Sequence, residues 1–215
     1  MLKANFITAQ EAAEKIQDGS TLCTIGMTLV SASESILKAI EKRFETVGHP
    51  ADITLVHSCG QSDRKDGIQH LAHEGLVKRI IGSHWGLQPR WMEMIANSQV
   101  EAYCLPQGQI AQLYRSMACG LPGKMSKVGL GTFIDPRVEG GKMNDRTKPL
   151  PDIVDILEYS GEEYMFYKEI PLDTVLIRGT VCDEMGNLTT TEEAMKLEVL
   201  PAVLAAKRYG GRVIA

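Results

Sequence analysis

The fold class is decided by the stretch Thr21-Leu-Cys-Thr-Ile25, by Gly26 directly after it, and by the segment Ser31-Ala-Ser-Glu34. The first five residues form a short β-prone run, and the glycine marks a turn. After Glu34, apolar residues recur at helical spacing as far as Phe44. The segment therefore predicts a strand, a glycine-containing loop and a helix, with Ser31 and Ser33 as helix-capping residues.

The same order of strand, loop and helix is repeated several times along the chain. Further β-prone runs are Ile53–Val56, Val77–Ile81, Val100–Cys104 and Thr174–Ile177. Helices are predicted after the capping box Thr8–Glu11, through Gln112 and Met117, and from about Glu192 to Lys207. Alternation of this kind is typical of an α/β fold with an open, mostly parallel sheet in a three-layer αβα arrangement. We expect one domain over residues 1–215.

Two further segments depart from this rhythm. Between about Ser126 and Pro151 the sequence is rich in Gly, Pro, Lys and Asp, which predicts a long functional loop. The second such segment is Arg212-Val-Ile-Ala215, a β-prone run at the end of the given sequence. We expect that additional chain, or a second chain, completes the sheet there, so that the domain is truncated and self-associates.

Composition narrows the function classes. The chain has 215 residues, 44% of them hydrophobic, and a formal net charge of −4 without a basic stripe, so nucleic acid is not an expected partner. The five cysteines are odd in number and contain no CxxC pair, which predicts reduced thiols in the cytoplasm. No targeting segment or membrane span is recognisable, so we expect a soluble protein without membrane contact.

Four stretches, taken together, carry a family resemblance. They are His70–Val77 leading to Gly82-Ser-His-Trp85, then Leu105-Pro-Gln-Gly108, then Gly129–Arg137 with Gly140–Asn144, and Gly179–Asp183 with Gly186-Asn187. In combination they resemble the N-terminal (alpha) half of a family I CoA-transferase of the acetate/propionate type, related to succinyl-CoA:3-oxoacid CoA-transferase. The similarity extends from about Thr8 to the end of the sequence.

The resemblance implies a reaction and its participants. Such an enzyme moves CoA between short-chain carboxylic acids such as acetate, propionate or acetoacetate, as in ketone-body metabolism, through an enzyme-bound glutamyl-CoA thioester. It implies that the nucleophilic glutamate belongs to the C-terminal (beta) half, so this chain alone is expected to be inactive. Acyl-CoA and a carboxylate are the implied substrates, coenzyme A is a substrate and not a cofactor, and a homo-oligomer is implied.

The resemblance also implies site residues. Gln107 corresponds to a side-chain amide that donates to the oxyanion, and Pro106 and Gly108 would hold its turn. The alternative is that Gln107 caps a helix or bonds a loop. The residues implied to bind substrate or CoA are Gly26, Met27, Cys59, Gly60, Gly108, Gly129 and Gly131. The segment Gly26–Ser31 has one glycine where some relatives have three or four, and each glycine has the alternative of serving only a turn.

Other signals are weaker. His70-x-x-His73-Glu74 could suggest zinc, but no third ligand is apparent at a telling spacing, so no metal is predicted. Glu139 is interpreted as a solvated loop glutamate, and His84, Trp85 and Trp91 as packing residues. The competing function is a non-catalytic module that binds a CoA ester or a phosphosugar on the same scaffold. A nicotinamide-dependent dehydrogenase is disfavoured because the GxGxxG fingerprint is missing after the first strand.

Overall fold

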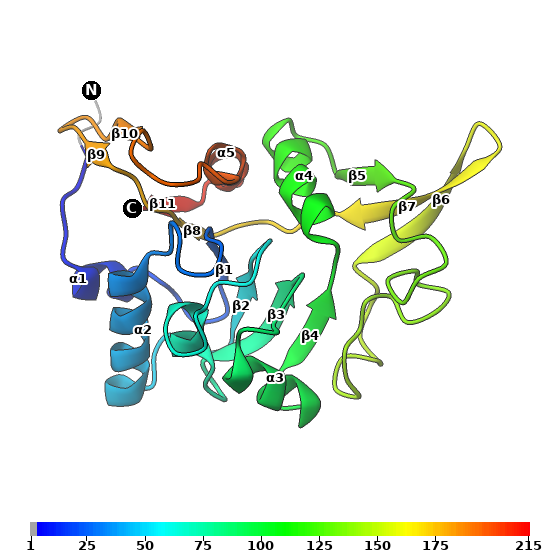
Figure 1. Ribbon diagram of the computed structural model, residues 1–215, viewed down its shortest axis with the longest axis horizontal. Coiled ribbons are helices and arrows are strands. Elements are labelled where there is room, and N and C mark those ends of the chain that lie inside the picture. Colours follow the sequence, from blue (N-terminus) through cyan, green and yellow to red (C-terminus); the bar gives the residue numbers. More distant parts are fainter. Residues whose placement is uncertain (1–3) are drawn as a thin grey trace.

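The computed structural model describes residues 4–215 and has a parallel sheet at its centre (Figure 1). In this part of the chain the sheet has six strands, all paired in parallel, in the order β11-β8-β1-β2-β3-β4. Their bounds are β1 (Thr21–Thr24), β2 (Ile53–Val56), β3 (Val77–Gly82), β4 (Glu101–Cys104), β8 (Thr174–Leu176) and β11 (Arg212–Ile214). The prediction of an open parallel sheet is confirmed.

Helices cover both faces of this sheet, which confirms the three layers. Successive strand residues point to opposite faces, so Leu22 packs in one core and Cys23 in the other. One face carries α1 (Ala9–Glu14), α2 (Glu34–Val47), the 3₁₀ helix η1 (Gly67–Leu71) and α3 (Pro89–Ala96). The other carries α4 (Gln107–Ala118) and α5 (Val199–Arg208).

Several helix boundaries differ from the predicted ones. The capping box at α1 is confirmed, because the Glu11 N–H donates to Thr8 Oγ1 at 3.2 Å and the Thr8 N–H donates to Glu11 Oε2 at 2.7 Å. That helix ends at Glu14, before the Asp18-Gly19 pair expected to end it. Helix α5 begins at Val199, seven residues after Glu192 (199 − 192), because the segment before it forms bends and turns.

The capping roles predicted for two serines are wrong. Ser33 occupies the N-cap position of α2, but its side chain makes no capping bond. Its hydroxyl donates instead to the Ile177 carbonyl at 2.8 Å, and the Ser31 hydroxyl donates to the Met195 carbonyl at 3.2 Å. Both hydroxyls therefore fasten the start of α2 to segments near the end of the chain. Such long-range partners are not visible in a local pattern.

A second, antiparallel sheet was not predicted. It consists of β5 (Gly123–Ser126), β6 (Val154–Tyr159) and β7 (Glu162–Lys168), in the order β5-β7-β6, and Figure 1 shows it beyond α4. The turn Ser160-Gly161 between β6 and β7 has positive φ at both residues, as a tight hairpin requires. The long segment between β5 and β6 contains turns and no helix or strand, in agreement with the predicted loop.

The remaining elements are short. Strands β9 (Val181–Cys182) and β10 (Leu188–Thr189) pair as a small antiparallel ribbon.

Among residues 4–215, no helix combines the length and the apolar character needed to cross a membrane. All five cysteines lie in that range and are free thiols. Trp85 and Trp91 are buried in the core under α3, which confirms their predicted role in packing.

Candidate functional site

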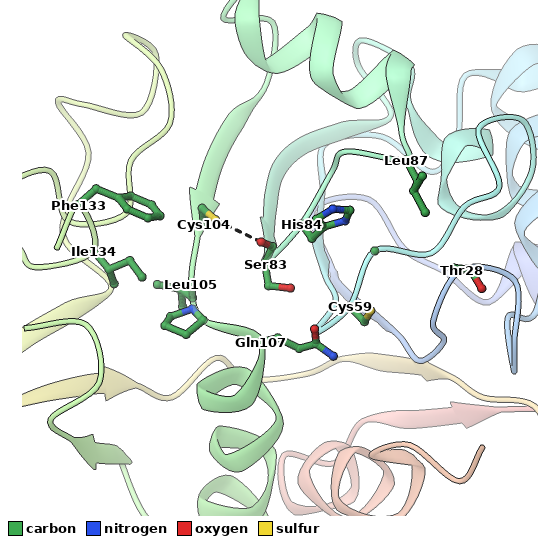
Figure 2. A pocket seen from close by; sticks show the side chains of 12 residues that line it. Thr28, Cys59, Ser83, His84, Leu87, Cys104, Leu105, Gln107, Phe133 and Ile134 are labelled. Carbon is green, nitrogen blue, oxygen red and sulfur yellow. Dashed lines mark hydrogen bonds between the residues drawn. The ribbon is translucent and has the colours of Figure 1, made fainter.

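A cavity of about 570 Å³ opens at the carboxyl ends of the parallel strands (Figure 2). Ligands of open α/β sheets bind at this edge, in crevices formed by the loops that follow the strands. The wall comes from the loops after β1, β2, β3 and β4, the first residue of α4, and the long loop before β6. Its residues are Thr28, Cys59, Gly60, Ser83, His84, Leu87, Cys104, Leu105, Pro106, Gln107, Phe133 and Ile134.

Gln107 is the first residue of α4 and extends into this cavity toward Cys59 (Figure 2). Pro106 takes the N-cap position, and no side chain caps this helix end. The alternative that Gln107 serves as a helix cap is therefore not realised. The N-terminal end of a helix carries a partial positive charge, so the amide lies where negative charge is favoured.

Cys59 lies beside Gln107 and remains a neutral thiol. Burial raises the pKa of the Cys59 thiol, and the nearby Glu198 carboxylate raises it further. The Gly60 N–H and the Gln107 side chain lie close to the sulfur and partly offset this effect. Across the cavity, burial raises the pKa of the Cys104 thiol to about 11. Both cysteines are therefore poor nucleophiles at neutral pH, since thiolate is the reactive form.

The structure brings three of the predicted site residues together. Gln107, Cys59 and Gly60 all lie in the cavity wall, whereas five others do not, namely Gly26, Met27, Gly108, Gly129 and Gly131. The roles of all eight in binding or catalysis remain predictions.

The five residues outside the wall occupy different surroundings. Gly26 lies against the Gln61 side chain, and Gly108 is in the first turn of α4, where a methyl group would meet no atom within 4 Å. A methyl group on Gly129 would lie 2.6 Å from the Tyr167 hydroxyl, under the small sheet. The Gly131 N–H donates to Asp135 at 2.9 Å.

Sequence reasoning had assigned only three of the twelve wall residues to the site. Ser83, His84, Phe133 and Ile134 belong to stretches that carried the resemblance, but none was predicted to line the cavity, and His84, interpreted as a packing residue, lies in its wall. The loop that carries Phe133 was recognised by its glycines and prolines, while its contact with the strand ends depends on the tertiary fold. Apolar side chains thus form the side of the cavity opposite His84 (Figure 2).

The two histidines considered as metal ligands contact carboxylates of α2. His70 Nε2 lies 2.8 Å from Glu34 Oε1, its Nδ1 contacts Glu41, and His73 Nε2 lies 2.9 Å from Glu41 Oε1. Carboxylates thus stand beside both imidazoles, contrary to the sequence reading that no third ligand accompanies them. The Lys38 ammonium lies 3.0 Å from Glu34 Oε1, so a lysine also contacts this cluster.

Replacing Gly60 by alanine is expected to destabilise the fold by about 1–2 kcal/mol, because close-packed sites tolerate added methyl groups poorly. The new methyl group would lie 2.9 Å from the His84 carbonyl oxygen and 3.0 Å from Nε2 of the buried Gln88. Urea unfolding measures the loss. Gly108→Ala is the matched control and should be neutral or slightly stabilising, because nothing lies within 4 Å of the added methyl group. Equal effects of the two substitutions would contradict this explanation.

Comparison with known proteins identifies the family. The family model described as coenzyme A transferase matches residues 6–209. Caffeate CoA-transferase of Acetobacterium woodii is 43% identical over 212 residues, which are 98% of this chain and 40% of that protein. The acetate CoA-transferase subunit alpha of Escherichia coli K12 is 26% identical over 95% of this chain and 83% of the relative.

A solved structure of a CoA-transferase has the same fold as this chain. The crystal structure of the acyl-CoA transferase YdiF apoenzyme from Escherichia coli O157:H7 superposes with a TM-score of 0.93 at 33% identity, covering 99% of this chain and 42% of that one. The chain thus spans about two fifths of the length of the caffeate CoA-transferase and of the YdiF structure, and most of the length of an alpha subunit. It belongs to the coenzyme A transferase family, within family I, and corresponds to the N-terminal, alpha half of such enzymes.

Proposed function

We propose that this chain is the alpha portion of an acyl-CoA:carboxylate CoA-transferase that moves CoA between short-chain carboxylic acids. In this proposal a glutamate of the complementary half attacks the acyl-CoA carbonyl and displaces CoA thiolate, forming a mixed anhydride. The thiolate then attacks the glutamyl carbonyl and releases the first acid, and the resulting glutamyl-CoA thioester passes CoA to the second acid by the reverse steps. The same proposal makes the complementary half a binding partner and the complete enzyme a homo-oligomer. Coenzyme A enters as a substrate, and no further cofactor takes part.

The placement of Gln107 is the observation that supports this proposal most. Attack on a thioester gathers negative charge on the carbonyl oxygen, and a neutral amide can stabilise that charge without neutralising the attacking carboxylate. Gln107 provides such an amide in the cavity, at the N-terminal end of α4. The thiols of Cys59 and Cys104 are neutral, which argues against a cysteine nucleophile in this wall and is consistent with a nucleophile from the complementary half.

The complete enzyme that contains this chain is expected to form acetyl-CoA from propionyl-CoA and acetate. Incubation with propionyl-CoA alone should leave CoA attached to a glutamate outside these 215 residues, which peptide mass spectrometry would detect.

The 215-residue chain assayed by itself should give no turnover. Turnover by that pure chain, unaffected by Glu139→Ala, would place the nucleophile among its own residues. Tight binding of the CoA ester without any transfer by the complete protein would favour a non-catalytic binding module.

A further inference from the structure

His57 is a fully buried residue directly after β2, and it lies behind the cavity wall. Its Nδ1 lies 2.8 Å from the Cys59 carbonyl oxygen, and its Nε2 lies 3.2 Å from the indole Nε1 of Trp85. A carbonyl only accepts and an indole N–H only donates. The imidazole is therefore neutral and protonated at Nδ1, which agrees with the effect of burial, since burial lowers the pKa of His57 to about 4.

The ring has no freedom to move. A methyl group on Gly82 would lie 2.4 Å from the His57 ring, so the ring fills the space that this glycine leaves at the end of β3. The Trp85 ring meets the imidazole edge to face, with the centroids 6.1 Å apart. Trp85 itself is buried. One neutral ring thus fixes the loop after β2 to the loop after β3.

This connection orients the wall that faces Gln107. The Cys59 carbonyl accepts from His57 Nδ1, and the Gly60 carbonyl accepts from the Thr28 N–H at 2.9 Å. The peptide planes on both sides of Gly60 are therefore fixed. The Cys59 side chain that projects from this fixed backbone is the one beside the Gln107 amide (Figure 2).

We infer that His57 is a positioning residue for the oxyanion donor: it fixes the Cys59–Gly60 wall against which the Gln107 amide is aligned, and Trp85 holds its ring. The inference rests on the proposed transferase function. Loss of the bond to Cys59 lets the wall shift, and a donor displaced by a fraction of an ångström stabilises the transition state less well. Binding of the CoA ester through its other contacts is unaffected.

The test compares His57→Asn with His57→Leu in the complete enzyme. An asparagine amide can take the place of Nδ1–H and donate to the Cys59 carbonyl, whereas leucine cannot. We expect His57→Leu to lower kcat about tenfold, equivalent to 1.4 kcal/mol, with KM for the CoA ester changed less than twofold. His57→Asn should recover kcat to within threefold of the parent enzyme. Equal kcat values for the two variants would overturn the inference.

A second measurement does not depend on transfer. Iodoacetamide labelling followed by peptide mass spectrometry gives the alkylation rate of Cys59 separately from that of the exposed Cys119. Labelling of Cys59 should accelerate at least fivefold in His57→Leu, and not in His57→Asn or in the control Ile80→Val, which trims the core of the neighbouring strand β3. An unchanged rate in His57→Leu would show that His57 does not fix the Cys59–Gly60 wall and would overturn the inference. A complete enzyme that transfers no CoA would refute the proposed function, while the labelling result would still decide the role of His57.

Discussion

Substitution of Gln107 by alanine in the complete enzyme is expected to lower kcat by a factor of about 10²–10³, or roughly 3–4 kcal/mol, the usual effect of losing one oxyanion donor. The bond strengthens as charge develops on the carbonyl oxygen, so kcat should fall more than substrate binding weakens. Gln107→Glu should be worse, because a carboxylate would repel the oxyanion. Steady-state kinetics with acetyl-CoA and propionate measure both variants.

The melting temperature should stay nearly constant in Gln107→Ala. Pro106 occupies the N-cap position, and no side chain caps α4, so truncation at position 107 removes no cap. A true cap would instead cost about 0.5–2 kcal/mol of stability with little change in turnover. Gln112→Ala, an exposed position of the same helix, is the matched control and should leave kcat unchanged. A fall of less than about threefold in Gln107→Ala would exclude Gln107 as the oxyanion donor.

The central sheet could be predicted because its strands are short, β-prone and separated by turn residues. Strand β2 was predicted with its observed bounds, Ile53–Val56, and the others differ by one residue at one end. The repetition of strand, loop and helix also placed Gln107 correctly, because the residue after β4 in such a sheet must lie at the carboxyl edge. The second sheet was not predicted, because the turn Ser160-Gly161 is not one of the Asn-Gly or Asp-Gly pairs that most strongly mark a tight hairpin in a sequence.

The outlying glycines show why the rest of the site could not be predicted. Glycine is favoured where φ is positive, and both Gly129 (φ 102°) and Gly131 (φ 70°) have such a backbone conformation inside the long loop. A sequence shows the glycine but not whether it serves a backbone turn or makes room for a ligand. The connection from His57 to Trp85 joins residues 28 positions apart on different loops, and no local pattern indicates it.

The long loop that carries Phe133 and Ile134 is organised by one buried carboxylate. The side chain of Asp135 is 1% exposed and accepts four hydrogen bonds, from the Gly131 N–H (2.9 Å), the Arg137 N–H (3.0 Å), Arg137 Nε (3.0 Å) and Arg137 Nη2 (2.8 Å). The Arg137 guanidinium holds the pKa of Asp135 well below its usual range. Burial acts in the opposite direction, and the N–H groups of Gly131 and Arg137 lower the pKa further. A loop of this length thus keeps a fixed shape next to the cavity.

Asp135→Ala is expected to destabilise the protein by about 2–3 kcal/mol at pH 7, since bonds to a charged acceptor contribute about 1.5–3 kcal/mol and water can reach the freed donors in this peripheral loop. Because the pKa of Asp135 is lower in the folded than in the unfolded state, its stabilisation is complete above the ordinary value of 3.8 and is lost as pH falls below it. The difference between parent and variant in urea unfolding should therefore shrink from pH 5 toward pH 3. Asp145→Ala removes an exposed carboxylate paired with Lys148 and should change stability little at any pH. A difference between Asp135→Ala and the parent that stays constant as the pH falls would show that the carboxylate charge does not hold this loop.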